Sequence, residues 1–177
     1  MMKVAQETGP AKTRQILSRF GFDMNTAWDN HNSDALNLAN ITLGSSIPVS
    51  LKTLTNAFTI LANKGHFVPS KSENAISEKT ANIVTQLLEK AVTDGTGKRA
   101  AISNVSVAGK TGTLSNKTYT STLALFAGYV PANEPRYVSI VVIENAQING
   151  SISKANGGNV AAPVFHNVLE KSLTMSK

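Results

Sequence analysis

Apolar side chains recur every three or four positions in two stretches of the chain, which is the spacing of one face of a helix. The stretch from Ser50 to Lys64 is followed by Gly65, a residue type that commonly ends helices. The stretch from Ser77 to Val92 opens on a serine that can cap a helix N-terminus. The two stripes are Leu51, Leu54, Ala57, Phe58, Leu61 and Ala62, and Thr80, Ile83, Val84, Leu87, Leu88 and Ala91. We expect two helices whose stripes face the protein core.

The second half of the chain changes to runs rich in Val, Ile, Leu and aromatic residues, each bounded by Asn, Gly, Pro or Ser. These runs, Val105 to Thr113, Leu123 to Val130 and Tyr137 to Glu144, predict three strands. The short connections between them favour antiparallel pairing. A closing helix, capped by Asn159, is expected to follow. Its apolar side consists of Val160, Val164, Phe165, Val168 and Leu169.

The first part of the chain has weaker signals. The residues up to Glu7 are typical of the end of a helix that Gly9 breaks, and Pro10 suits the first turn of a second, short helix ended by Gly21. Residues 22–46 are Asn-rich and weakly periodic, which predicts a loop. The expected fold class is therefore α+β, mainly helical over 1–104, with a three-stranded antiparallel β-meander and a closing helix over 105–177, the helices packing on the sheet.

Composition narrows the possible functions. The 177 residues are 41% hydrophobic and 16% charged, as expected for a globular domain, and the net charge of +6 favours anionic partners or a solvated basic face. Nucleic-acid binding has little support, because aromatic residues make up only 6% and like charges do not form long runs. The absence of cysteine excludes disulfides and thiolate metal sites, and His31, His66 and His166 lack ligand spacing. We expect no metal and no organic cofactor.

Targeting signals are also missing from the sequence as written. The opening residues contain no apolar segment of the signal-peptide type. The longest apolar run, Leu123 to Val130, is far too short to cross a bilayer. We expect no membrane segment in these 177 residues.

The stretch "VAGKTGT", Val107 to Thr113, carries the candidate chemistry. A phosphate-binding loop needs a glycine five positions before Gly109, but Asn104 stands there, and the loop must lie between a strand and a helix. A nucleotide-binding protein remains an alternative only if the strand prediction over 105–108 is wrong.

A carboxylate-binding strand fits the same stretch better. At the end of an edge strand, the Lys110 ammonium can stabilise a carboxylate, and Thr111 and Thr113 can donate hydrogen bonds to it. Gly112 would let an extended substrate approach the backbone and pair with it. A backbone N–H near Thr113 could help to hold an oxyanion. The pleat places Lys110 and Gly112 on one face and the two threonines on the other, unless the strand twists or bulges.

Several longer segments resemble the transpeptidase domain of penicillin-binding proteins, most closely the septal, class B type. "GTGKRAAISNVSVAGKTGT" resembles the approach to that family's active-site strand, and "RFGFD" resembles its "RFGFG" stretch. "PVSLKTLTNAFTILANKG", "FAGYVPANEPRYVSIVVIENA" and "GGNVAAPVFHNVL" resemble, in order, a helix, the following strand pair and the closing helix. The resemblance implies the C-terminal part of a penicillin-binding or β-lactamase-like transpeptidase fold.

The resemblance also implies a reaction, D,D-transpeptidation of peptidoglycan stem peptides, in which a serine attacks the penultimate D-alanine carbonyl. The implied site uses a Ser-x-x-Lys, a Ser-x-Asn and a Lys-Thr-Gly element, and β-lactams bind there too. Residues 151–154 and 72–74 fit the first two patterns by letter, but both matches are expected to be chance because of their positions. The nucleophile is expected upstream of Met1, so that Lys110, Thr111, Gly112 and Thr113 remain as substrate contacts and the chain alone is inactive.

The same resemblance predicts partners and location. Two further strands of the family's sheet would pair beside "RYVSIVVIE", so this edge is expected to bind the missing N-terminal half or a second copy. The family works at the periplasmic face of the inner membrane, whereas the chain as written is expected in the cytoplasm. The alternative is a non-catalytic binding or assembly module of the division machinery.

Overall fold

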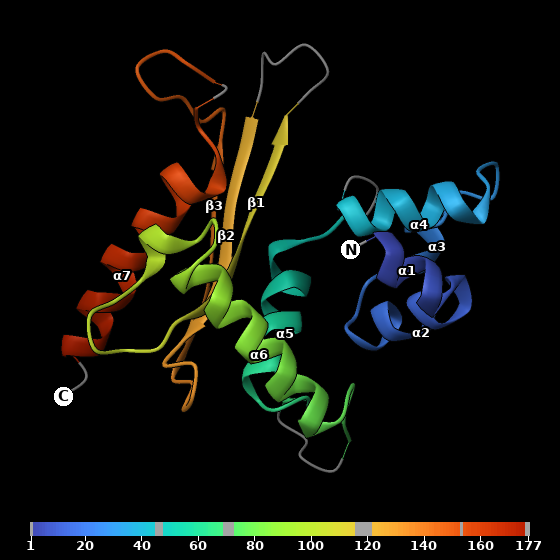
Figure 1. Cartoon of the computed structure of the whole chain (residues 1–177), viewed down its shortest axis with the longest axis horizontal. Coiled ribbons are helices and arrows are strands. Elements are labelled where there is room, and N and C mark those ends of the chain that lie inside the picture. Colours follow the sequence, from blue (N-terminus) through green and yellow to red (C-terminus); the bar gives the residue numbers. More distant parts are fainter. Residues whose placement is uncertain (1, 45–47, 69–72, 116–121, 153, 176–177) are drawn as a thin grey trace. The chain divides into compact units, whose positions relative to one another are not determined.

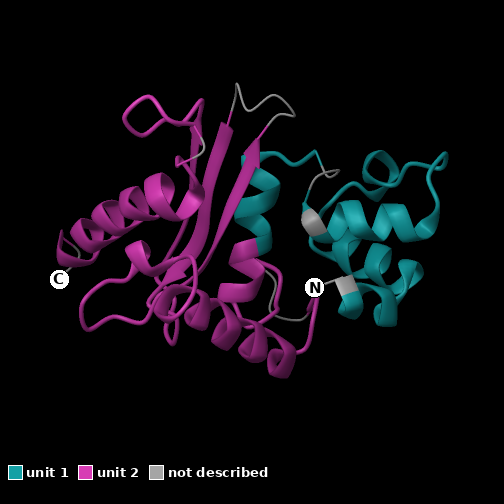
Figure 2. Cartoon of the chain, turned by 45° about the horizontal axis from the view of Figure 1, so that its top comes forward, with its two compact units in different colours: residues 1–57 teal, residues 58–177 magenta. Residues whose placement is uncertain are grey.

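The computed structural model describes residues 2–44, 48–68, 73–115, 122–152 and 154–175. The chain divides into two compact units, residues 1–57 and residues 58–177, which Figure 2 shows in different colours. Helix α5, Leu51–Ala62, contains the boundary between them.

The first unit is helical. Its helices are α1, Met2–Thr8; α2, Pro10–Arg19; α3, Met24–Ala27; and α4, Asp34–Leu43, followed by the first turns of α5. Gly9 separates α1 from α2 and Pro10 lies in the first turn of α2, as the sequence predicts. Gly21 follows α2 with a φ of +86°, which confirms the expected stop.

The prediction of a loop over residues 22–46 is wrong for α3 and α4. The side chain of Asp23 accepts a hydrogen bond at the start of α3, and that of Ser33 does so at the start of α4. Asn37 is buried and its side chain donates to Asp29 O at 2.8 Å, which fixes the turn between the helices. The helices then bury a small cluster, Met24, Ala27, Trp28, Leu38 and Ile41.

The second unit contains the sheet. Strands β1 (Ala108–Ser115), β2 (Thr122–Val130) and β3 (Tyr137–Glu144) pair antiparallel in the order β1-β2-β3, which confirms the meander and the α+β class. β1 starts three residues later than predicted. Val105 bridges to Ile102 instead, and Ser106 O accepts from Ala132 N at 2.8 Å, so that residues 105–107 lie outside the ladder.

Helices cover the two faces of this sheet (Figure 1). α7, Ala162–Met175, packs on one face, where the Phe126 and Phe165 ring centroids lie 4.8 Å apart. α6, Glu78–Thr93, and the end of α5 pack on the other face around Tyr129. Both predicted helices are confirmed, and the Ser77 side chain caps α6 by accepting from Thr80 N.

Two details of these helices differ from the sequence prediction. On α6 the side turned inward contains Ala81, Leu88 and Val92, whereas Ile83 and Leu87 of the predicted core stripe are 49% and 62% exposed. The inward side is therefore rotated about the helix axis from the predicted stripe, because packing on the sheet, and not periodicity within the helix, selects it.

The closing helix starts earlier than predicted. The side chain of Asn156, not that of Asn159, caps it by accepting from Asn159 N at 3.0 Å. A π-helical turn, η2, Gly157–Ala161, then leads into α7. This turn brings the glycine pair Gly157–Gly158 against β1, as described below.

Candidate carboxylate-binding site

All four predicted site residues lie on β1, an edge strand with only β2 beside it among the described residues. In the ladder, Lys110 is opposite Ala127 and Thr113 is opposite Ala124. Because β1 is an edge, alternate backbone N–H and C=O groups of the strand have no strand partner. Edge strands of this kind are where an extended peptide can add a strand to a sheet.

The Lys110 ammonium lies next to Thr111. Its Nζ donates to Thr111 O at 2.9 Å and to Thr111 Oγ1 at 3.4 Å. The side chain is exposed, and among the described residues no carboxylate forms an ion pair with it. Its hydrogen-bond partners are neutral, so no neighbouring described carboxylate offsets its attraction for an anionic ligand.

The two threonines face the η2 side, and each hydroxyl has a partner within the protein. Thr111 Oγ1 lies 2.6 Å from Thr96 Oγ1, and Thr113 Oγ1 accepts from Gly157 N at 3.1 Å. A threonine hydroxyl has one proton and two acceptor positions, so Thr113 still has its proton to donate. The lysine and the threonines thus start on different faces, but the lysine side chain brings Nζ back to Thr111.

The glycine pair of η2 makes this arrangement possible. A methyl group on Gly157 would lie 2.2 Å from Leu125 O and 2.5 Å from Gly112 O. One on Gly158 would lie 2.3 Å from Thr96 O. Only glycine therefore lets η2 approach the β1–β2 ladder and the turn at Thr96 this closely.

The sequence alone does not identify Thr96, Gly157 or Gly158 as site residues. They lie in the "GTGKRA" and "GGNV" segments, which already stand out as glycine-rich turns before helical residues. Their contacts with Thr111 and Thr113 join residues 15 and 44 positions apart, which no local pattern shows.

Of the two other serine matches, only the Ser-x-x-Lys match has its serine among the described residues, and that serine does not lie at a helix start. Ser151 forms an isolated bridge with Ile148 in the segment after β3, and Ser153 of the same match lies outside the described residues. Ser72 of the second match also lies outside them, and Asn74 bridges to His66.

Although residues 105–107 lie outside β1, the nucleotide-binding alternative fails on the geometry of the residues that follow them. Gly109, Lys110 and Thr111 lie within β1, paired with β2, whereas a phosphate loop wraps its ligand between a strand and a helix.

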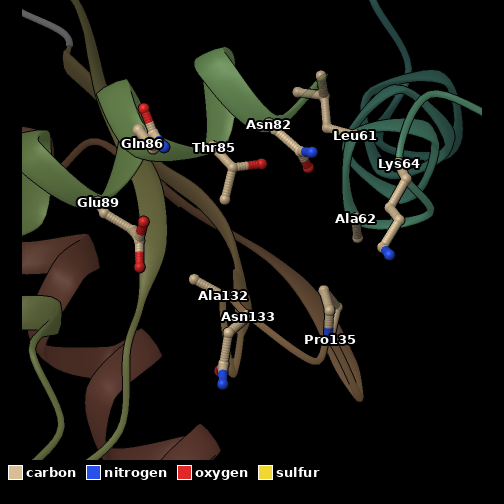
Figure 3. A pocket seen from close by; sticks show the side chains of 10 residues that line it. All are labelled: Leu61, Ala62, Lys64, Asn82, Thr85, Gln86, Glu89, Ala132, Asn133 and Pro135. Carbon is tan, nitrogen blue, oxygen red and sulfur yellow. The ribbon is translucent and has the colours of Figure 1, made fainter. Parts of the chain in front are cut away.

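A separate polar hollow of about 260 Å³ lies beside α6 and the β2–β3 turn (Figure 3). Lys64, Gln86, Glu89 and Asn133 line it, and none of the four β1 site residues does. Next to it the Tyr129 hydroxyl lies 2.7 Å from Thr85 Oγ1. Burial raises the pKa of Tyr129, and the charge of Glu89 adds to this, against the opposing hydrogen bond from Thr85.

Within the described ranges, no three His, Cys, Asp or Glu side chains gather as they would around a metal ion. No helix in this part of the chain has the length and apolar character needed to cross a membrane.

Known proteins resemble the chain over most of its length. The model of the penicillin binding protein transpeptidase domain matches residues 1–170. A probable peptidoglycan D,D-transpeptidase, PenA of Neisseria flavescens, is 33% identical over 153 residues, which are 77% of this chain and 37% of PenA. PbpC of Pseudomonas aeruginosa, another probable peptidoglycan D,D-transpeptidase, is 29% identical over 98% of this chain and 34% of its own length. The chain thus spans about a third of these curated relatives.

Solved structures give the same result. The transpeptidase domain of the FtsI4 D,D-transpeptidase from Legionella pneumophila superposes with a TM-score of 0.89 at 47% identity, covering 97% of this chain and 64% of that one. Penicillin binding protein 3 from Mycobacterium tuberculosis, solved with aztreonam, superposes with a TM-score of 0.82 at 24% identity over 99% of this chain and 48% of its own, and shows the same fold. The chain belongs to the penicillin-binding protein transpeptidase family.

Proposed function

We propose that this chain is the carboxylate-binding, C-terminal part of a peptidoglycan D,D-transpeptidase domain, over residues 1–177. Lys110, Thr111, Gly112 and Thr113 bind the terminal carboxylate of a stem peptide or of a β-lactam. The serine nucleophile comes from polypeptide outside these 177 residues.

The position of the Lys110 ammonium is the observation that carries the proposal. It lies on an open strand edge, has only neutral partners and adjoins the Thr111 hydroxyl. A carboxylate placed there would gain a charge-assisted hydrogen bond from Lys110, and Thr113 has a proton to add. Gly112 leaves the strand without a side chain between these groups, so an extended peptide fits along β1.

Two observations support a nucleophile from outside. The Legionella transpeptidase domain, at 47% identity, matches over only 64% of its chain, so that domain contains polypeptide with no counterpart here. Within this chain the Ser151 match lies in a bridge after β3 and not at the start of a helix. The 177 residues alone are therefore expected to bind ligand reversibly without forming an acyl-enzyme.

Binding is tested by titrating the ¹⁵N-labelled chain with an N-acetylated D-alanyl-D-alanine peptide and with its C-terminal amide. The amide has nearly the same shape but no negative charge. We expect the peptide acid to shift the backbone N–H signals of residues 110–113 at a lower concentration than the peptide amide does. Lys110→Met is expected to abolish this preference for the acid. Equal binding of both peptides by the wild-type chain would contradict the proposal and favour the non-catalytic binding module.

We further propose that β3 pairs with a strand from outside the chain. No strand covers its outer edge in the part of the chain that the structure describes, although Val138, Ile140 and Val142 are apolar and only half-buried. Such an edge favours pairing with the rest of the domain or, in the isolated chain, with a second copy.

Sedimentation velocity tests the pairing in the isolated chain. Wild-type protein is expected to self-associate, and Ile140→Lys is expected to reduce this by placing a charge on the edge. Leu87→Lys, at an exposed position on α6, is the matched control. A wild-type chain that sediments as a monomer at all concentrations and melts cooperatively would contradict the prediction.

A further inference from the structure

The turn that precedes the lysine–threonine strand contributes a side chain to the site. Thr96 Oγ1 lies 2.6 Å from Thr111 Oγ1, and Thr111 Oγ1 lies 3.4 Å from the Lys110 ammonium. The three groups form a continuous hydrogen-bonded chain on the exposed side of β1. We propose that Thr96 is a positioning residue for carboxylate binding, acting through Thr111. The inference rests on the proposed function of the same strand.

The direction of the hydrogen bonds supports this role. A lysine ammonium only donates, so the Thr111 oxygen accepts from Lys110. A bound carboxylate only accepts, so Thr111 has to give its single proton to the ligand. Thr96 must then be the donor to Thr111, which leaves every group of the chain satisfied. A chain of this kind polarises the hydroxyl that meets the carboxylate.

The backbone holds Thr96 in place for this purpose. Gly97 N donates to Ala91 O at 2.8 Å, and Gly95 N donates to Lys90 O at 3.1 Å, so the end of α6 fixes both neighbours of Thr96. On the other side, Gly158 lies so close to Thr96 O that a methyl group there would come within 2.3 Å of it. The backbone at Thr96 is therefore held in place before a ligand binds, which limits the entropy lost on binding.

A second contact does the same for Thr113. Gly157 N donates to Thr113 Oγ1 at 3.1 Å and leaves the Thr113 proton for a ligand. The turn at Thr96 and the glycine pair of η2 thus orient the two hydroxyls of the strand from the same side. Gly157 contacts Thr113 through its backbone N–H, which a side-chain substitution does not remove. The contact between Thr96 and Thr111 is therefore the one that a substitution can test.

The test compares Thr96→Val, which keeps the shape and removes the hydroxyl, with Thr96→Ser, which keeps the hydroxyl. Thr93→Val is the matched control, because it removes an exposed threonine hydroxyl from the same segment whose partner is Asp94. Each variant is titrated with the N-acetylated D-alanyl-D-alanine peptide and its amide. Loss of one hydrogen bond of ordinary strength predicts about fivefold weaker binding of the acid by Thr96→Val. Thr96→Val is expected to bind the peptide amide as the wild type does. Thr96→Ser and Thr93→Val are expected to bind the peptide acid with wild-type affinity.

A ligand-free measurement keeps the inference separate from the proposed function. Three-bond couplings report the χ1 rotamer of Thr111, which we expect to be single in the wild type and averaged in Thr96→Val. If the wild type does not distinguish acid from amide, the proposed function fails, and the Thr111 couplings still decide whether Thr96 holds that side chain. If the wild type does distinguish them and Thr96→Val does so equally well, or if the Thr111 rotamer is unchanged in Thr96→Val, the inference is overturned.

Discussion

Substituting Gly157 by alanine tests the packing that supports the site. Gly157 lies in the π-helical turn η2 and has no positive φ, so a helical position without neighbours would gain from the change. The expected gain from propensity alone is about 0.5–1 kcal/mol. The surroundings of Gly157 make the substitution destabilising instead. The new methyl group would lie 2.2 Å from Leu125 O and 2.5 Å from Gly112 O, where ordinary contact begins at 3.4 Å.

Both obstructing atoms belong to the backbone of the β1–β2 ladder, so a change of side-chain rotamer does not relieve the clash. Either η2 moves away from β1 or the ladder opens at Gly112. Overpacking of this kind costs about 1–3 kcal/mol, and we expect the urea midpoint of unfolding to fall by about 1 M. The movement should also break the bond from Gly157 N to Thr113 and weaken binding of the acid peptide.

Far-UV circular dichroism in urea gives the free energy of unfolding, and amide hydrogen exchange at Gly112 and Leu125 localises the change. Trp28, the one tryptophan of the sequence, belongs to the helical unit 1–57, whereas the sheet belongs to the unit 58–177, so circular dichroism is preferred to tryptophan fluorescence. The control is Gly150→Ala, which has a φ of +74° and no atom within 4 Å, so only backbone strain is expected there. A Gly157→Ala protein as stable as wild type, with unchanged exchange at Gly112, would refute the reasoning.

Three further predictions concern the second unit. Burial raises the pKa of Tyr129 above 10.0, so this tyrosine ionises first in the unfolded chain and stability falls as the pH rises above that value. Tyr129→Phe should remove this fall of the urea midpoint at alkaline pH. An unchanged fall in Tyr129→Phe would contradict the prediction. Phe126→Ala removes a fully buried ring packed on Phe165 and should cost about 3–5 kcal/mol in thermal unfolding. Leu87→Ala, at an exposed position, should change stability by less than about 0.5 kcal/mol. If Phe126→Ala and Leu87→Ala had equal effects, the burial of Phe126 between the sheet and α7 would be contradicted. Ser77→Ala removes the cap of α6 and should cost about 1 kcal/mol, which Ser77→Asp should restore.

The regular elements of the second unit follow from local patterns. Helices α5 and α6 have apolar residues at helical spacing, Gly65 follows the end of α5 and Ser77 caps the start of α6. The three strands are separated by turn residues. These signals depend on neighbours within a few positions, so one sequence is enough to find them.

The misplaced elements depend on distant partners. In α4 the apolar residues alternate with Asn and Thr, and the buried Asn37 finds its hydrogen bonds eight positions away at Asp29. The face of α6 that packs inward is chosen by the sheet, which leaves Ile83 and Leu87 exposed. A tertiary surface decides both outcomes, and a periodic pattern does not contain it.

The site also contains residues that a local motif identifies and residues that only the folded structure brings together. Lys110 to Thr113 stand out as a short motif because their chemistry is local to one strand. Thr96 and Gly157 contribute only after folding places them against that strand. Their roles follow from interatomic distances and not from residue types.

Intact-mass spectrometry after incubation with benzylpenicillin tests the central claim most directly. The claim is that these 177 residues supply the carboxylate-binding strand while the serine nucleophile comes from elsewhere. Folded wild-type protein and Lys110→Ala are both predicted to keep their unmodified masses. An adduct of the drug's mass on the wild-type chain, absent from Lys110→Ala, would show a working nucleophile within the 177 residues and contradict the account.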